Sequence, residues 1–282
     1  MYSAQELVSN IEDLAVLPSV YHRVREQLES PDGSVTEVAR LVAADPALTT
    51  GVLRLVNSAF YGFARKIESV ERAIPILGLQ QTHELVLAMS VSAIFEGIKP
   101  QRMNMKRFWH GCMMCALASR EIAYMACNPA GERMFVIGLL ADIGHLVMYQ
   151  TVPTLAVEAR ARAEASGIPL HEAERHLIGC DHAEIGATLM DAWHLPPSFA
   201  EIIGAQIVPQ LGGEYVREAE LLHVAIAVAR ADHYNMSSDE AAARISAQIW
   251  NGIGLKPWIF ARAREAAELH LAASIATFFP RM

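Results

Sequence analysis

Apolar residues along the chain recur at helical spacing, and the alternating pattern typical of strands is absent. Ser3, Ser34 and Asp181 each stand three residues before a glutamate, which is the spacing of a capping box at a helix N-terminus. Asp45-Pro46 combines a cap residue with proline at the first helical position. The pattern predicts an all-α protein with about thirteen helices and no sheet.

The longest apolar run, Met134 to Tyr149, is interrupted by Asp142 and His145. A membrane span needs ~20 apolar residues with few charges, so this run predicts a buried core helix. The N-terminal segment carries acidic residues where a secretory signal would be basic. We therefore expect a cytoplasmic protein that does not associate with a membrane.

A polar segment with glycine and proline, GIKPQRMN at 97–104, separates two apolar periodic regions. It predicts a boundary between an N-terminal subdomain, residues 1–98, and a C-terminal subdomain, residues 99–282. The expected helices are short in the first and longer in the second, for example over 105–127 and 214–236. Because the connections are short, we expect a compact bundle of two closely packed helical subdomains.

The charge pattern argues against direct binding of nucleic acid. The net charge is −8, and no cluster of lysine and arginine residues is present. Neutralisation of phosphates by a basic face supplies much of the affinity of nucleic-acid-binding proteins. The four cysteines do not form a disulfide framework. Cys112 and Cys115 form a CxxC on a long apolar segment, where two buried thiols are the expected reading.

Several motifs occur in a fixed order along the chain and together resemble the HDOD family, whose name stands for an HD-related output domain. The motifs are LP at 17–18, DPALTTGVLRLVNSAFYG at 45–62, IESVERAIPILG at 67–78, FW at 108–109, GLLADIGHLVM at 138–148 and HAEIGATLMDAWHLP at 182–196. The resemblance covers roughly residues 14–232. It implies an HD-domain-like helical bundle in the C-terminal part and a role in bacterial signal transduction, often as the output of a response regulator.

The resemblance also bears on catalysis. In catalytic HD-domain phosphohydrolases, an adjacent His-Asp pair, an earlier His and a later Asp bind a metal that activates water. Side chains that cannot serve as these ligands occupy the corresponding positions here: Gly111, Ala141, Ala205 and Gln206. His110 is a poor substitute for the earlier His, because adjacent helical residues point ~100° apart. We expect no enzymatic activity and no cofactor, although a weakly held divalent ion is compatible with what remains.

The remaining family ligands are Asp142, His182 and Asp232, and they define a vestigial pocket together with His145. His145 follows Asp142 by three residues on the same helix face and is a candidate partner for it. One interpretation is a hydrogen-bonded core in which Asp142 is buried and bonds His182 or helix-end amides. The other is a ligand pocket inherited from a metal site. His171-Glu172 and His176 resemble a zinc motif, but their spacing favours a solvated helix face.

These observations predict a non-catalytic regulatory output module that acts through protein–protein interaction. The candidate partner surface is an aromatic loop formed by Phe60, Tyr61 and Phe63 with Arg65, although packing inside the N-terminal subdomain explains the same rings. Expected partners are sensor kinases, response regulators or cyclic-dinucleotide enzymes, and a homodimer is compatible with the sequence. The alternatives are a residual metal-dependent phosphohydrolase acting on a nucleotide or cyclic dinucleotide, and a small-molecule sensor that uses the vestigial pocket.

Overall fold

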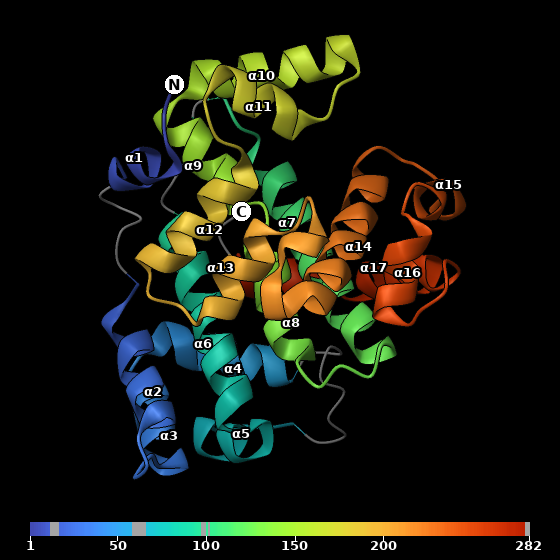
Figure 1. Ribbon diagram of the computed structural model, residues 1–282. Helices are drawn as coiled ribbons and strands as arrows, with labels where there is room; N and C mark the ends of the chain where they lie inside the picture. The colour runs from blue at the N-terminus through green and yellow to red at the C-terminus, as the bar shows by residue number, and fades with distance from the viewer. Residues whose placement is uncertain (12–16, 58–65, 97–99, 101, 280–282) are drawn as a thin grey trace. The chain divides into compact units, whose positions relative to one another are not determined.

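A computed structural model describes all residues except 12–16, 58–65, 97–99, 101 and 280–282 (Figure 1). The described residues form helices labelled α1 to α17 and two short 3-10 helices, without any strand. The predicted all-α class is confirmed. The helices are more numerous than expected, because several apolar runs break into two helices at a glycine, a proline or a polar residue.

The chain forms two compact units. Unit 1 contains residues 1–15 and 99–267, and unit 2 contains residues 16–98 and 268–282. The predicted division at 98/99 differs from these units at both ends of the chain. The N-terminal 15 residues belong with unit 1, and the last residues, including the end of α17 (Ile259–Phe278), belong with unit 2.

Unit 2 is built from five shorter helices together with the end of α17. These are α2 (Ser19–Glu29), α3 (Val35–Ala43), α4 (Pro46–Val56), α5 (Val70–Leu77) and α6 (Leu79–Glu96). As predicted, Asp45 caps α4, and its Oδ1 accepts hydrogen bonds from the amides of Ala47 and Leu48. Ser34 precedes α3 but makes no capping bond, and the Glu37 side chain pairs with Arg40.

Asn57 ends α4 and ties it to the start of a later segment. Its Nδ2 donates to the carbonyl of Ile67 and its Oδ1 accepts from the amide of Ile67, both at 2.7 Å. The φ of Asn57 is −91°, so this helix does not end in the left-handed conformation that is common at helix C-termini. The side chain therefore acts through hydrogen bonds that join positions on either side of residues 58–65.

Unit 1 contains the remaining helices. They are α1 (Ala4–Ser9), α7 (Met105–Met125), α8 (Gly131–Leu140), α9 (Ile143–Thr151), α10 (Pro153–Ser166), α11 (Leu170–Leu177), α12 (His182–Ala192), α13 (Pro197–Gly204), α14 (Val216–His233), α15 (Ser238–Ala243), α16 (Ala247–Ile253) and the first part of α17. Within this unit α7 packs on α8 and α14, and α12 packs on α9 and α13. The predicted capping box at Ser3 begins α1, and Asp181 begins α12 as an N-cap whose Oδ1 accepts a hydrogen bond from the amide of Glu184.

The longest apolar run does not form one helix. It divides into α8 and α9, with Ala141 and Asp142 in a turn between them. The stretch Gly131–Thr151 is long and apolar enough to cross a membrane, but 83% of its most apolar window is buried inside the protein. That burial agrees with the predicted core position, and the break places the Asp142 side chain at the start of α9.

Candidate functional site

Four ionisable side chains of unit 1 meet where α9, α11 and α12 come together. Asp142 precedes α9, His145 lies one turn later, Glu174 lies in α11, and His182 is the first residue of α12. In Figure 1, α9 and α12 lie side by side, as their packing requires. Gly144 permits this approach, because a Cβ at that position would overlap the backbone carbonyl of His182. We call these four side chains the carboxylate–imidazole cluster.

Glu174 connects the two histidines of the cluster. Its Oε1 lies 2.7 Å from Nε2 of His145, and its Oε2 lies 2.8 Å from Nδ1 of His182. The same Oε2 accepts a hydrogen bond from the backbone amide of His182 at 3.2 Å. Burial alone would raise the pKa of Glu174, but the charge and hydrogen bond of His145 and the hydrogen bond of His182 hold it well below its usual value.

His145 lies between two carboxylates. Its Nδ1 is 2.6 Å from Oδ1 of Asp142, and its Nε2 bonds Glu174. Burial would lower the pKa of His145, but the charges of Asp142 and Glu174 outweigh it and raise this pKa to about 10. At neutral pH His145 is therefore an imidazolium that donates from both ring nitrogens.

Asp142 is the member of the cluster that faces solvent. Its side chain is 48% exposed, whereas the side chains of His145, Glu174 and His182 are almost fully buried. The interpretation of Asp142 as a buried group bonded to His182 or to helix-end amides is therefore wrong, because its side chain is half exposed, bonds His145 and makes no capping hydrogen bond to α9. The proposed pairing of Asp142 with His145 is confirmed. Desolvation opposes ionisation of Asp142, but His145 nevertheless lowers its pKa.

Asp232 lies outside the cluster, although the sequence placed it in the same pocket. A potential metal-binding group contains Asp142, His145 and His182, and Asp232 is not a member. The carboxylate of Asp232 lies 3.6 Å from Nδ1 of His110 and 3.7 Å from Nη2 of Arg264. The carboxylate of Asp232 therefore faces the His110 ring and the Arg264 guanidinium and does not face Asp142.

Two of the positions that lack family ligands meet in space. The side-chain amide of Gln206 is buried and donates to the carbonyl of Ala141 at 2.9 Å. The backbone carbonyl of Gln206 in turn accepts a hydrogen bond from Nδ1 of His223 at 2.8 Å. An amide-to-carbonyl contact thus joins the positions where the family pattern places metal-binding histidines.

The cluster contains one residue that the sequence interpretation missed. Glu174 follows His171 and Glu172 in a segment interpreted as a solvated helix face, and Glu172 and His176 are indeed exposed there. Glu174 is 1% exposed, on the opposite side of α11 beside Ala173. The sequence did place an acidic residue, Glu174, eight positions before His182. Spacing along the chain does not show which face of α11 is buried, so it could not assign Glu174 to the cluster.

Other predicted features have mixed outcomes. The CxxC cysteines, Cys112 and Cys115, are buried and unpaired, as expected, and burial raises the pKa of Cys115 to about 12. The predicted partner surface, formed by Phe60, Tyr61, Phe63 and Arg65, lies outside the described residues. Its place in the fold stays a prediction.

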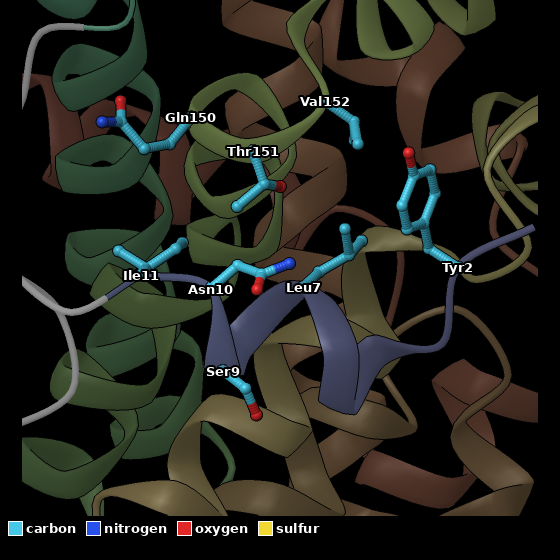
Figure 2. A pocket seen from close by; sticks show the side chains of 8 residues that line it. All are labelled: Tyr2, Leu7, Ser9, Asn10, Ile11, Gln150, Thr151 and Val152. Carbon is cyan, nitrogen blue, oxygen red and sulfur yellow. The ribbon is translucent and has the colours of Figure 1, made fainter.

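A separate hollow of about 600 Å³ lies between α1 and the end of α9 (Figure 2). It is lined by Tyr2, Leu7, Ser9, Asn10, Ile11, Gln150, Thr151 and Val152. None of these side chains is a carboxylate, an imidazole or a thiol, so the hollow offers neither a metal ligand nor an acid–base pair that titrates near neutral pH. The chemistry of unit 1 is concentrated in the carboxylate–imidazole cluster.

Comparisons with known proteins place this geometry in a family context. A structure from Shewanella amazonensis SB2B named "Putative phosphohydrolase" is 28% identical, with a TM-score of 0.75 and coverage of 98% of both chains. A structure from Marinobacter aquaeolei VT8 named "Putative signal transduction protein" is 21% identical, with a TM-score of 0.70, covering 93% of this chain and 58% of that one. An uncharacterized protein of Treponema pallidum (strain Nichols) is 25% identical over 194 residues, which are 68% of this chain and 37% of that protein.

The sequence model of the HDOD domain matches residues 14–209, more than half of the chain. This range contains the carboxylate–imidazole cluster and the motifs from which the resemblance was first drawn. The all-α architecture is the one that the resemblance implied. The chain belongs to the HDOD domain family and carries a regulatory, HD-related domain.

Proposed function

We propose that this chain is a non-catalytic signal-transduction module that acts by binding other signalling proteins. The observation that carries the proposal is the contact between Gln206 and Ala141, because an amide and a methyl group replace metal-binding side chains at adjoining positions. With Gly111 at a third such position, the ligand set of an HD-type hydrolytic centre is incomplete. A module without this centre can transmit a signal by presenting a surface.

Its partners would be cytoplasmic sensor kinases, response regulators or enzymes of cyclic-dinucleotide metabolism. The proposed contact surface is the aromatic loop of Phe60, Tyr61 and Phe63 with Arg65, since aromatic and arginine side chains supply most of the binding energy at interfaces. The net charge of −8 gives no support to direct binding of nucleic acid.

The competing function is a residual phosphohydrolase. The name of the Shewanella relative suggests this activity, and three cluster residues carry metal-ligand chemistry. A small-molecule sensor built on the same cluster is the remaining alternative. Partner capture and hydrolysis assays separate these functions.

The experiment is a pull-down from native lysate with wild-type protein, Tyr61→Ala, and Tyr234→Ala as control. Tyr234 is also aromatic and is 61% exposed, but it lies at the end of α14 in unit 1. The expected result is a signalling protein that is captured by wild type and Tyr234→Ala and is lost with folded Tyr61→Ala. Capture that Tyr61→Ala leaves unchanged would place the binding surface elsewhere. Hydrolysis that requires Asp142 would overturn the non-catalytic function.

A further inference from the structure

The carboxylate–imidazole cluster has the composition of a transition-metal site that differs from the family's ligand set. Asp142, His145 and His182 each offer one ligand atom, and these three atoms lie within 4.8 Å of one another. Two imidazole nitrogens and one carboxylate oxygen suit zinc and related late transition metals. Mg²⁺ and Ca²⁺ prefer sites made of oxygen atoms alone.

Glu174 occupies the position expected of a residue that orients metal ligands. Histidine ligands usually donate their second ring N–H to a carboxylate, which fixes the ring and makes the ligating nitrogen more basic. Here Glu174 bonds Nε2 of His145 and Nδ1 of His182 with its two oxygens. The opposite nitrogen of each ring, Nδ1 of His145 and Nε2 of His182, is thereby left as the ligand atom.

The two rings and the third ligand are also well placed for one ion. The rings of His145 and His182 stack with their centroids 4.2 Å apart and their planes inclined by 15°. Because both rings point one nitrogen at Glu174, each keeps its other nitrogen on the side away from Glu174, and the three ligand atoms lie within 4.8 Å of one another. Asp142 contacts His145 on that side and is 48% exposed, which gives an ion a route from solvent.

From this geometry we infer that Asp142, His145 and His182 bind one divalent ion of the zinc class, with Glu174 positioning both histidines. The ion takes the place of the proton that now lies between Asp142 and His145, and that proton passes to solvent. The ligand set departs from the sequence-based expectation of no cofactor, since His145 is not one of the family's ligand positions. Asp232, which is one of them, takes no part.

Binding of this kind is independent of the proposed signalling role and requires no hydrolysis. Three protein ligands hold an ion in many zinc sites, with water in the fourth position. In this module the ion would join the start of α9 to the start of α12 through Asp142, His145 and His182. Occupancy would then stabilise unit 1 as any ligand that binds only the folded state does.

The test measures binding of Zn²⁺ by titration calorimetry and of Co²⁺ by its visible absorption, using the full chain stripped of metal. Wild type is compared with the ligand variants Asp142→Asn and His182→Gln and with the positioning variant Glu174→Gln. Glu172→Gln and His176→Gln are matched controls, because they change an acid and an imidazole that are exposed on α11. Asp232→Asn tests the family's ligand set.

The expected result is one equivalent of Zn²⁺ in wild type and in both controls, with a raised thermal midpoint. Asp142→Asn and His182→Gln abolish this binding, and Glu174→Gln weakens it roughly 10- to 100-fold. If His182→Gln does not fold, the test rests on Asp142→Asn, because the Asp142 side chain is half exposed and its substitution leaves the core intact. Zn²⁺ binding that is absent in wild type, that survives Asp142→Asn, or that depends on Asp232 or on the exposed Cys127 would overturn this ligand set. None of these outcomes bears on partner capture.

Discussion

The imidazole rings of His145 and His182 lie one over the other, with centroids 4.2 Å apart, and both direct a nitrogen at Glu174. Two stacked imidazoles would repel each other if both were protonated, and a buried carboxylate would be costly without donors. The observed hydrogen bonds give His145, His182 and Glu174 each a partner, since Glu174 accepts from both rings and from the backbone amide of His182. The stability of unit 1 should therefore depend on Glu174 more than on the better exposed Asp142.

Glu174→Gln is expected to lower the free energy of unfolding by ~3–5 kcal/mol, because removing one partner leaves the His145 charge buried without full compensation. Urea denaturation of wild type and variant measures this difference. Glu172→Gln is the matched control, since it lies two residues earlier on the exposed face of α11. An effect of Glu174→Gln no larger than that of the control would show that the buried hydrogen bonds contribute little.

Asp142→Ala is expected to cost less, about 0.5–1.5 kcal/mol, because solvent replaces part of the interaction with His145. The measurement is the thermal midpoint in metal-free buffer, beside Glu174→Gln. Loss of stability should be the main effect of this substitution, since no catalytic activity is expected in wild type. A loss of stability as large as that of Glu174→Gln would contradict the exposure of Asp142.

The protein is expected not to hydrolyse cyclic dinucleotides or phosphate monoesters, since Gly111, Ala141, Ala205 and Gln206 stand where HD-type ligands are required. Product is measured by chromatography in the presence of Mg²⁺, Mn²⁺, Fe²⁺ or Zn²⁺, with Asp142→Ala as the control for contamination. Turnover that disappears in that variant would show that the altered ligand set still supports catalysis.

Acid is expected to destabilise unit 2 through His83. This side chain is 5% exposed, packs against the Tyr21 ring at a tilt of 30°, and makes no hydrogen bond from either ring nitrogen within the described residues. Burial, aided by the charge of Arg25 and opposed by that of Glu29, lowers the pKa of His83 to about 4. The folded state therefore favours the neutral ring, and its stability falls as the pH drops from the unfolded-state pKa of about 6.5 toward 4.

The expected loss is roughly 3 kcal/mol by pH 4, because the unfolded state takes up the proton over this whole range and the folded state does so only near its lowered pKa. Urea denaturation between pH 7 and pH 4 measures it in wild type, His83→Gln and the partly buried control His22→Gln. His83→Gln should flatten the pH dependence, whereas His22→Gln should keep it. Equal pH profiles for wild type and His83→Gln would assign the acid sensitivity to other groups.

A pair of glycine substitutions tests the approach of α9 to α12. Gly144→Ala should destabilise the protein by ~1–3 kcal/mol, because the new methyl group would overlap the carbonyl of His182. Gly111→Ala should stabilise it by about 0.5–1 kcal/mol, because Gly111 lies inside α7 with open space around its Cα. A thermal midpoint of Gly144→Ala that is unchanged or raised would contradict the close packing at Gly144, and a lowered midpoint of Gly111→Ala would contradict the open space at Gly111.

Local sequence patterns determined the all-α class, since apolar spacing and cap residues act within a few positions of one another. Ser3, Asp45 and Asp181 begin helices by bonding amides two or three residues ahead. The link between Asp142 and His145 could be predicted for the same reason, since three residues is one helical turn. Ser34 has the same spacing to Glu37 but makes no cap bond, and Glu37 pairs with Arg40.

Only the tertiary structure decided which distant groups meet. Glu174 joins His145 across 29 positions of sequence, and Gln206 reaches Ala141 across 65. The same structure directs Asp232 to His110 and Arg264, although the family pattern predicted that it would accompany Asp142. Spacing along one helix determines which side chains share a face, but burial and pairing depend on the neighbouring helix, whose position is set by packing of the whole core.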